Sequence, residues 1–407
     1  MSVLVRQATP EDLPGMISND FRAFGVPPAQ NEKGLDQAER YLDLDRFFVG
    51  EDRGDIVANS GAFSLDLTLP GGTQLPVSGV TWVAVGATHR RQGLLRTMMA
   101  EMERDARDRD EVAMALFASE GGIYANVGFG AATQIRAVSI ATDRAVFRTS
   151  VDPSAGSLRH LDAAEAAQVL PELHERLATA SVGEVTRGEV WWQGQLFDAR
   201  EPVPHVVVFS DASDQITGSL CYRQTAEWHN GHPHHQVEVV DARIGDRAAH
   251  HALWSFICSL DLVGTVTTMH LPLDDPLPTL LVDPRAVRTT ELIDGLWIRL
   301  LDVERWFSTR SYGAAGDVVI DVEGGGDGVA GRWRITSGTD ETGSCRSDAD
   351  AADVALTAID LGAVSLGGTS VIQLERGGRV EERRPGAVAE LAAMLRRDPL
   401  PFCATEF

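Results

Sequence analysis

Positive charge is scarce in this 407-residue sequence. Lysine and arginine together number 36 against 59 aspartates and glutamates, which gives a formal net charge of −23 at pH 7, and Lys33 is the single lysine. Such a surface repels nucleic acids and anionic membranes and attracts cationic molecules. We therefore expect cationic partners, and neither a nucleic acid nor a membrane among them.

Cysteine and long apolar runs are scarce as well. The four cysteines lie far apart, with no CxxC pair and no Cys/His pair at zinc-finger spacing. No run approaches the roughly 18 apolar residues of a membrane span, and residues 1–6 lack the basic region and apolar run of a signal peptide. These absences predict reduced thiols and a cytoplasmic protein.

Several catalytic signatures are missing too. There is no P-loop, no GxSxG and no HExxH, which argues against nucleotide hydrolysis, serine-esterase and zinc-protease chemistry. Histidines gather in one short stretch, but Trp228–Pro233 is typical of a hairpin turn with solvated imidazoles. We expect no metal at these histidines, which are His229, His232, His234 and His235.

Strands and helices alternate through the first 140 residues, which predicts a mixed α/β sheet. Helices are expected from Thr9, a capping hydroxyl followed by Pro10, and from Leu94, where methionines recur at helical spacing. Strands are expected at residues 3–6, 46–50, 55–63, 79–85 and 111–118.

The region from about 150 to 295 repeats this order in a weaker form. Strand Gln236–Ala242 and the helix after it match strand Gly79–Val85 and its helix, which indicates a diverged internal repeat. Around them, the patterns predict a helix opening at Leu161 and further elements at residues 204–210, 215–222, 246–260 and 265–271.

A third, strand-rich region follows from about residue 296, with glycine-rich turns. We expect two amphipathic helices over residues 351–361 and 386–397, on either side of a strand near Val371 and Ile372. Layered α+β packing is the simplest fold for such a region. Linkers are expected at residues 152–157 and 289–295, where the periodicity is interrupted.

The most specific pattern is a buried strand that ends in a short polar turn and leads directly into a helix. The strand ends at Val83–Val85, and the helix follows Gly93. The first N–H groups of a helix have no partner within it, so a helix start beside Arg90 and Arg91 suits a pyrophosphate. An ordinary strand–helix corner with solvated arginines is the alternative.

The sequence ends in an apolar segment, Pro399–Phe407, instead of a polar tail. Termini are normally disordered unless they are tied down, so we expect this segment to be ordered. Burial of Phe407 for stability alone is one interpretation of the pattern.

The strand, turn and helix resemble motif A of the GCN5-related N-acetyltransferases (GNAT). The Arg/Gln-x-x-Gly-x-Gly/Ala loop of that motif stands here as Arg90–Leu95, with Leu95 at the final small position. The whole chain resembles the Eis (enhanced intracellular survival) acetyltransferases through this motif together with Ala118–Tyr124, Asp274–Pro278, Asp294–Trp297 and the terminal Glu406–Phe407.

This resemblance implies a mixed α/β protein of three domains. They are a catalytic GNAT domain over residues 1–148, a degenerate GNAT-like domain over 149–295, and a sterol-carrier-protein-like α+β domain over 296–407. The implied activity is acetyl-CoA-dependent N-acetylation of amines on aminoglycosides and other cationic acceptors, at several positions, by a homohexamer. A noncatalytic lipid or acyl-CoA binding protein is the alternative, but it would need neither a complete cofactor loop nor a catalytic acid and base.

The resemblance also assigns the chemistry. Tyr124 would be the general acid, because a phenol with a pKa of about 10 can donate a proton as charge forms on the departing sulfur. A tyrosine that only packs is the alternative. The C-terminal carboxylate of Phe407 would be the general base, since it both attracts an ammonium and accepts its proton. The Val83 N–H is expected to face the developing oxyanion.

The resemblance places the cofactor along the strand and the helix start. The implied cofactor contacts are Val83, Ala84, Val85, Arg90, Arg91, Gln92, Gly93, Leu94, Ser119 and Glu120. The amine pocket is expected to include Trp82, Phe24 and Glu406, and for each of them ordinary packing is the alternative. The central copy carries Asp241–Asp246 where the cofactor loop would fall, and its acids oppose a pyrophosphate, so one active site per chain is expected.

Overall fold

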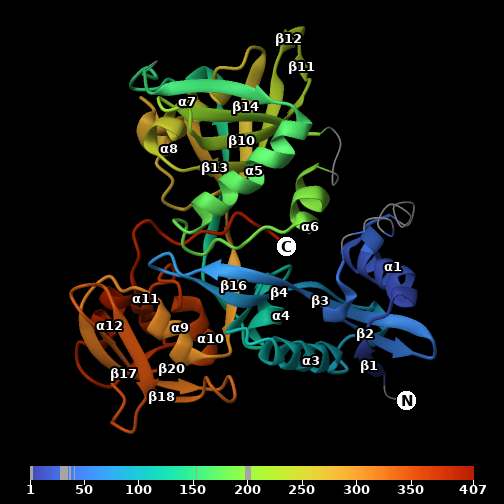
Figure 1. The fold of residues 1–407 in the computed structure, drawn as a ribbon, viewed down its shortest axis with the longest axis vertical. Coiled ribbons are helices and arrows are strands. Elements are labelled where there is room, and N and C mark those ends of the chain that lie inside the picture. The colour runs from blue at the N-terminus through green and yellow to red at the C-terminus, as the bar shows by residue number, and fades with distance from the viewer. Residues whose placement is uncertain (1–2, 28–34, 36–37, 41, 153, 198–202) are drawn as a thin grey trace. The chain divides into compact units, whose positions relative to one another are not determined.

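The computed structural model describes residues 3–27, 35, 38–40, 42–152, 154–197 and 203–407, and its chain packs into two compact units. The first unit contains the residues up to Thr133, then residues 296–397 and 406–407. The second unit contains residues 134–295 and 398–405. Figure 1 shows the elements of both.

A seven-stranded sheet forms the N-terminal part of the first unit. Strands β4 and β5 are parallel neighbours, and the other neighbouring pairs are antiparallel. In sheet order, the strands are β1 (Leu4–Gln7), β2 (Phe47–Asp52), β3 (Asp55–Thr68), β4 (Gln74–Val85), β5 (Ala113–Phe117), β16 (Leu296–Leu300) and β6 (Gly130–Ala131).

Two amphipathic helices cover opposite faces of this sheet. Phe47 packs in a core with Met16 of α1, whereas its neighbour Phe48 packs in a core with Met102 of α3. Consecutive residues of a strand point to opposite faces, so the two helices lie on different sides. The helical segments here are η1 (Pro10–Asp12), α1 (Leu13–Phe24), η3 (Leu44–Arg46), η4 (Ala87–His89), α3 (Leu94–Asp108) and α4 (Gly121–Ala125).

The first unit also contains a smaller five-stranded sheet with its own helices, visible in Figure 1 around β17, β18 and β20. In sheet order its strands are β19 (Gly343–Ser347), β18 (Gly331–Ser337), β17 (Gly316–Glu323), β20 (Val354–Thr357) and β21 (Glu381–Glu382). The helices are α9 (Val303–Thr309), α10 (Ala358–Val364), α11 (Val371–Arg376) and α12 (Ala387–Leu395).

Two predictions for this region were wrong. The segment predicted as a helix over 351–361 contains strand β20, and the helix begins only at Ala358, because the Thr357 hydroxyl and Asp360 form a capping box there. The strand predicted near Val371 is helix α11, which Ser370 caps by accepting from the Gln373 N–H. The helix predicted over 386–397 is present as α12.

A second seven-stranded sheet forms the centre of the second unit. Its only parallel neighbours among the described strands are β13 and β14. In sheet order the strands are β15 (Val287–Asp294), β7 (Gln134–Ala141), β14 (Val263–Leu271), β13 (His235–Ile244), β10 (Ile216–Thr225), β9 (His205–Asp211) and β8 (Gly156–Leu161). The helical segments are η5 (Thr142–Arg144), α5 (Ala163–Ala178), α6 (Glu189–Trp191), η6 (Trp192–Phe197), α7 (Arg247–Cys258), α8 (Leu277–Leu280) and η7 (Pro284–Ala286).

The linkers predicted in this part of the chain differ from the structure. Residues 289–295, predicted as a linker, largely belong to β15, an edge strand whose exposed, polar residues hide the usual apolar pattern. Strand β8 begins within the other predicted linker, at Gly156, and Pro153 of that segment lies outside the described residues. The predicted histidine hairpin is present as β11 (Trp228–His229) and β12 (His232–Pro233).

Two strands pair in a different large sheet from the one that their place in the sequence suggests. Strand β7 lies within the sequence range predicted for the first domain but pairs in the second sheet. Strand β16 follows the predicted second domain and inserts between β5 and β6 of the first sheet. The predicted α/β fold is confirmed, and the domain boundaries at residues 148 and 295 stay predictions.

Candidate active site

Strands β4 and β5 begin side by side and then part. They pair only from Val77 to Gly79, although β4 continues to Val85. A bulge against β3 accompanies the separation, and Trp82 adopts a positive φ of 54° there. Within the described chain, the edge of β4 that faced β5 therefore has no strand partner beyond Gly79, and its N–H and C=O groups can pair with an amide-rich ligand.

Buried amides hold the bulge in place. The Asn59 side chain donates to the Trp82 C=O at 2.7 Å, and the Asn19 side chain donates to Asn59 Oδ1 at 2.7 Å. Asp20 lies next to them, and one of its oxygens, Oδ1, is buried without a hydrogen-bond partner among the described groups. Burial raises the pKa of the Asp20 carboxyl from 3.8 to about 6, against a smaller effect of Asn59. Sequence analysis missed these residues, because α1 and β3 bring them together from separate segments.

The turn after β4 leads into the start of α3, as predicted. Gly93 precedes the helix with φ 82°, a conformation that favours glycine, and a Cβ at this position would meet open space. The Arg90 Nε donates to the Val85 C=O at 3.3 Å, which ties the turn to the strand. The side chains of Arg90, Arg91 and Gln92 are exposed, and Leu94 is buried at the first helical position. Exposed cations beside unpaired helical N–H groups make a site for an anion.

Tyr124 belongs to helix α4 and is only 6% exposed. Its ring lies edge-on to Phe129, with 6.2 Å between the ring centroids, inside the core that includes Met114. Burial raises the pKa of the phenol above its ordinary value, and a hydrogen bond with the exposed Ser119 opposes this rise. Glu120, also exposed, stands at the start of the same helix. Tyr124 is therefore a protonated donor at neutral pH.

Phe407 lies where β4 and β5 part. Its ring packs edge-on against Phe117 of β5, with 5.5 Å between centroids. On β4, a Cβ added to Gly79 would come within 3.1 Å of the Phe407 ring and 2.4 Å of Leu65. A glycine inside a strand often marks such a close approach, and this signal was available in the sequence. The preceding residue, Glu406, is exposed.

The predicted walls of the amine pocket lie on separate elements of the first unit, and their place in the pocket stays a prediction. Trp82 packs edge-on against Phe47, with 6.3 Å between centroids, and joins the core beneath α1. Phe24 is the last residue of α1 and is 55% exposed. Among the described side chains, no ring contact links Phe24 to Trp82 or to Phe407.

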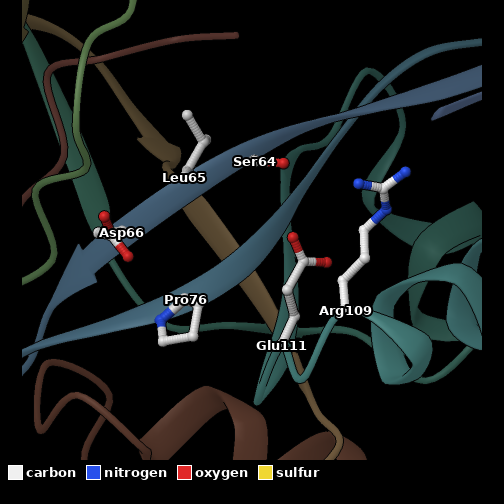
Figure 2. A pocket seen from close by; sticks show the side chains of 6 residues that line it. All are labelled: Ser64, Leu65, Asp66, Pro76, Arg109 and Glu111. Carbon is white, nitrogen blue, oxygen red and sulfur yellow. The ribbon is translucent and has the colours of Figure 1, made fainter. Parts of the chain in front are cut away.

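A separate cavity of about 410 Å³ opens near the other end of β4, and Figure 2 shows its lining side chains on β3, β4 and the α3–β5 turn. The Glu111 carboxylate in its wall is held by Arg46, through two hydrogen bonds of 2.7 and 2.8 Å. None of the predicted site residues lines this cavity, whose walls are Ser64, Leu65, Asp66, Pro76, Arg109 and Glu111.

The second unit contains a similar pair of strands followed by a helix. Strands β13 and β14 pair from His235 to Val239, and β13 then continues to Ile244. The helix after it, α7, starts differently from α3, because the Asp246 side chain accepts from the Ala249 N–H at 2.9 Å. A carboxylate already occupies this helix start, which opposes a second anion site.

Two further searches concern only the described residues. No three histidine, cysteine, aspartate or glutamate side chains gather there as metal ligands. No described helix combines the length and apolarity needed to cross a membrane. The four cysteines are free and buried.

Comparison with known proteins accounts for each region. Family models described as an acetyltransferase (GNAT) domain match residues 4–132 and 183–308, and a sterol carrier protein domain matches residues 303–404. The two GNAT matches confirm the predicted internal repeat. They also make the protein an acetyltransferase, so the noncatalytic alternative is set aside.

Relatives resemble this chain over most of its length. An uncharacterized N-acetyltransferase of Streptomyces avermitilis is 35% identical over 392 residues, 93% of each chain. The N-acetyltransferase Eis of Mycobacterium tuberculosis is 30% identical over 369 residues, 87% of this chain and 86% of that one. The crystal structure of Eis1 from Mycobacterium abscessus matches with a TM-score of 0.88 and 31% identity, covering 99% of this chain and 100% of that one. The chain belongs to the Eis family of GNAT N-acetyltransferases.

Proposed function

We propose that this N-acetyltransferase takes its acetyl group from acetyl-CoA and transfers it to amines of cationic small molecules, aminoglycosides among them, at more than one position. The observation that carries the proposal is the position of Phe407. Its ring packs at the parting of β4 and β5, in the same unit as Tyr124 and the start of α3. This position of the ring supports a role for the terminal carboxylate in acyl transfer.

Acetyl-CoA fits the residues of the first unit. The free edge of β4 at Val83–Val85 offers backbone groups to the amides of the pantetheine arm. The start of α3, with Arg90 and Arg91 exposed beside it, suits the diphosphate, and Gly93 leaves room for close approach. When bound, acetyl-CoA supplies an acetyl group activated as a thioester.

The protein's own groups would move the protons. The carboxylate of Phe407 attracts the acceptor ammonium and takes its proton, which frees the nitrogen lone pair for attack. Tyr124 is protonated at neutral pH, burial raises its pKa further, and it donates to the departing sulfur. The Val83 N–H, on the unpaired edge of the bulged strand, stabilises the negative charge that develops on the acetyl oxygen.

Charge supports a cationic acceptor. The chain has a formal net charge of −23, and the exposed Glu406 adds a carboxylate next to Phe407. The same charge opposes nucleic acids and anionic membranes as partners. We also propose, from the family resemblance, a cytoplasmic homohexamer, which light scattering of the purified protein would test.

A chain extended by a few small residues beyond Phe407 tests the function. If Phe407 only packs, the ring keeps its contacts and turnover stays nearly native. If its carboxylate is the base, the extension converts it into a neutral amide, and kcat falls by about 10²-fold or more. Release of free CoA from acetyl-CoA with kanamycin measures the rate, and acetyl-CoA affinity should change little. An extended protein with native turnover would contradict the proposal.

A further inference from the structure

The second unit buries four charged side chains in one cluster, which we call the tail clamp: Glu184, Arg187, Asp241 and Arg243. Arg187 donates twice to Asp241, at 2.8 and 3.1 Å, and Arg243 donates to Glu184. All four side chains are nearly inaccessible to solvent. Asp241 and Arg243 lie on β13 beyond its last pair with β14.

The clamp is electrically balanced. Burial alone would raise the pKa of the Glu184 carboxyl, but the guanidiniums of Arg243 and Arg187 outweigh it and hold the pKa below its ordinary value. Asp241 behaves in the same way beside Arg187 and Arg243. Burial, with both arginines adding to it, lowers the pKa of nearby His174 to about 3. His174 is therefore neutral, and two carboxylates face two guanidiniums.

Thr405 is the group that the clamp holds. Its hydroxyl accepts from Arg187 Nε at 2.8 Å and from Arg243 at 3.3 Å, and donates to Glu184 Oε1 at 2.5 Å. Thr405 is only 1% exposed. Glu184 also accepts from the Ala404 N–H at 3.3 Å. Three of the four clamp side chains thus bond to one short stretch of the tail.

The preceding tail is held at alternate residues. The Leu400 N–H donates to Asp274 at 2.8 Å, and the Phe402 N–H donates to the Val182 C=O at 2.9 Å. With Ala404, the bonded N–H groups recur every second residue, which is the period of an extended chain. The tail is therefore fixed along its length as far as Thr405.

A polar clamp fixes register in a way that apolar packing would not. Buried ion pairs add little net stability compared with apolar residues of the same size, but they can specify one arrangement. The tail residues Phe402, Cys403 and Ala404 are apolar or weakly polar and could pack in shifted positions. A slip of one residue would move the Thr405 hydroxyl by about 3.3 Å, beyond hydrogen-bond reach of the clamp.

We propose that the tail clamp sets the position of the C-terminal carboxylate, so that Glu184, Arg187, Asp241 and Arg243 are positioning residues for acyl transfer. This inference rests on the proposed function of Phe407 as the base. One residue, Glu406, separates Thr405 from Phe407, so their Cα atoms are at most about 7 Å apart, and register at Thr405 limits where the carboxylate can be.

Thr405 offers the sharpest test, because Thr405→Val keeps the shape and removes the hydroxyl, whereas Thr405→Ser keeps it. We expect Thr405→Val to lower kcat with acetyl-CoA and kanamycin by about 10- to 100-fold, since errors near 1 Å at a reacting group have this scale. The KM for acetyl-CoA should stay within about twofold. Thr405→Ser should restore most of the rate. Thr290→Val, at an exposed threonine of β15, is the matched control and should be native.

A second readout does not depend on catalysis. A carboxypeptidase selective for aromatic C-termini should release Phe407 at least tenfold faster from Thr405→Val than from the native chain or Thr405→Ser. Should Thr405→Val fail to fold, Asp274→Ala removes the exposed acceptor of the Leu400 N–H and should change both readouts about threefold in the same direction. A native kcat together with a native rate of Phe407 release in the folded variants would contradict the proposal that the clamp positions the carboxylate.

The variant extended beyond Phe407 distinguishes a failure of the tail-clamp proposal from a failure of the proposed function. If extension beyond Phe407 abolishes turnover while Thr405→Val is native, the base assignment stands and the clamp is wrong. If extension leaves turnover native, the base assignment is wrong, and the clamp as a positioning device for catalysis fails with it. The release of Phe407 then still shows whether Thr405 holds the tail.

Discussion

The two GNAT domains share an arrangement of two parallel strands and a helix, but different residues lie at the helix start and on the strands. In each, two parallel strands pair briefly and then part, β4 from β5 after Gly79 and β13 from β14 after Val239, and a helix follows the longer strand. In the first, the helix start is a glycine beside exposed arginines. In the second, Asp246 caps the helix, and β13 carries buried ion pairs beyond its last pair with β14. The backbone alone therefore does not decide whether a pair of parting strands can bind a cofactor.

Two aspartates, Asp241 and the half-buried Asp20, show the same contrast in charge. Asp241 of the second unit is bonded twice by Arg187, and the arginines hold its pKa below the ordinary value although burial acts against them. Asp20 of the first unit has an unpartnered oxygen, and burial raises its pKa to about 6. A carboxylate paired with a guanidinium stabilises the fold. The charged form of an unpaired carboxylate is unfavourable in a desolvated position until it binds a proton or a cation.

Removing the charge of Asp241 should have the largest effect on stability. Asp241→Asn leaves Arg187 buried without its carboxylate, and breaking such a pair costs about 3–5 kcal/mol. We expect urea unfolding, followed by tryptophan fluorescence, to show the loss, because the Arg187 guanidinium lies 3.5 Å from the Trp191 ring centroid. Asp214→Asn in the exposed β9–β10 turn is the control, expected to be neutral. Equal stability of both variants would contradict a functional pairing of charges in the clamp.

Tyr124→Phe should separate chemistry from structure in the first domain. The ring keeps its edge-on contact with Phe129, so the fold and the acetyl-CoA affinity should be native. The variant lacks only the hydroxyl, and we expect kcat to fall by about 10²-fold. Steady-state kinetics from pH 6 to 10 measures this. Undiminished turnover across that range would remove Tyr124 from the role of acid.

Local patterns were the part of the site that the sequence could predict. The turn from Arg90 to Gly93 and the helix after it are neighbours in the chain, so glycine, charge and periodicity identify them together. The tail clamp was missed because Arg187 meets Asp241 only in the fold. Considered alone, Asp241 was interpreted as an acid that repels pyrophosphate. Edge strand β15 was missed for another reason, since its exposed residues carry no apolar alternation.

Reversing the cations at the start of α3 should weaken acetyl-CoA binding. The double variant Arg90→Glu with Arg91→Glu places like charge beside the diphosphate, and we expect calorimetry to show a Kd raised about 10- to 30-fold, or about 1.4–2 kcal/mol. Arg247→Glu is the matched control, because Arg247 is the exposed first residue of α7. It should leave the affinity unchanged. Equal effects of the two changes would indicate general charge repulsion instead of a site.

The stability of the first unit should depend on pH through Asp20. Its folded pKa of about 6 lies above the ordinary 3.8, so the folded chain binds the extra proton between these values. The contribution of this group is fully present below about pH 4 and is lost as the pH rises through about 6. Asp20→Asn should therefore stabilise the protein by up to about 3 kcal/mol at pH 8 and by much less at pH 4. Thermal unfolding at the two pH values measures the difference, and an equal gain at both would assign it to packing.

The smallest effect is expected at the start of α7, where the two domains differ most simply. Asp246→Ala removes the oxygen that accepts from the Ala249 N–H, a loss of about 1 kcal/mol for a helix cap. Asp246→Asn keeps an acceptor and should lose only a fraction of this.

Neither Asp246 variant should gain acetyl-CoA binding, because the start of α7 has one exposed arginine, Arg247, where the start of α3 has two, and uncapping the helix adds no further cation. Denaturant unfolding and calorimetry on both variants measure these quantities. A second acetyl-CoA site in Asp246→Ala would show that the helix cap alone prevents binding in the second domain. A single site in the native chain and in both variants is the expected result, since the buried bonds among Arg187, Asp241, Arg243 and Thr405 remain when the cap is gone.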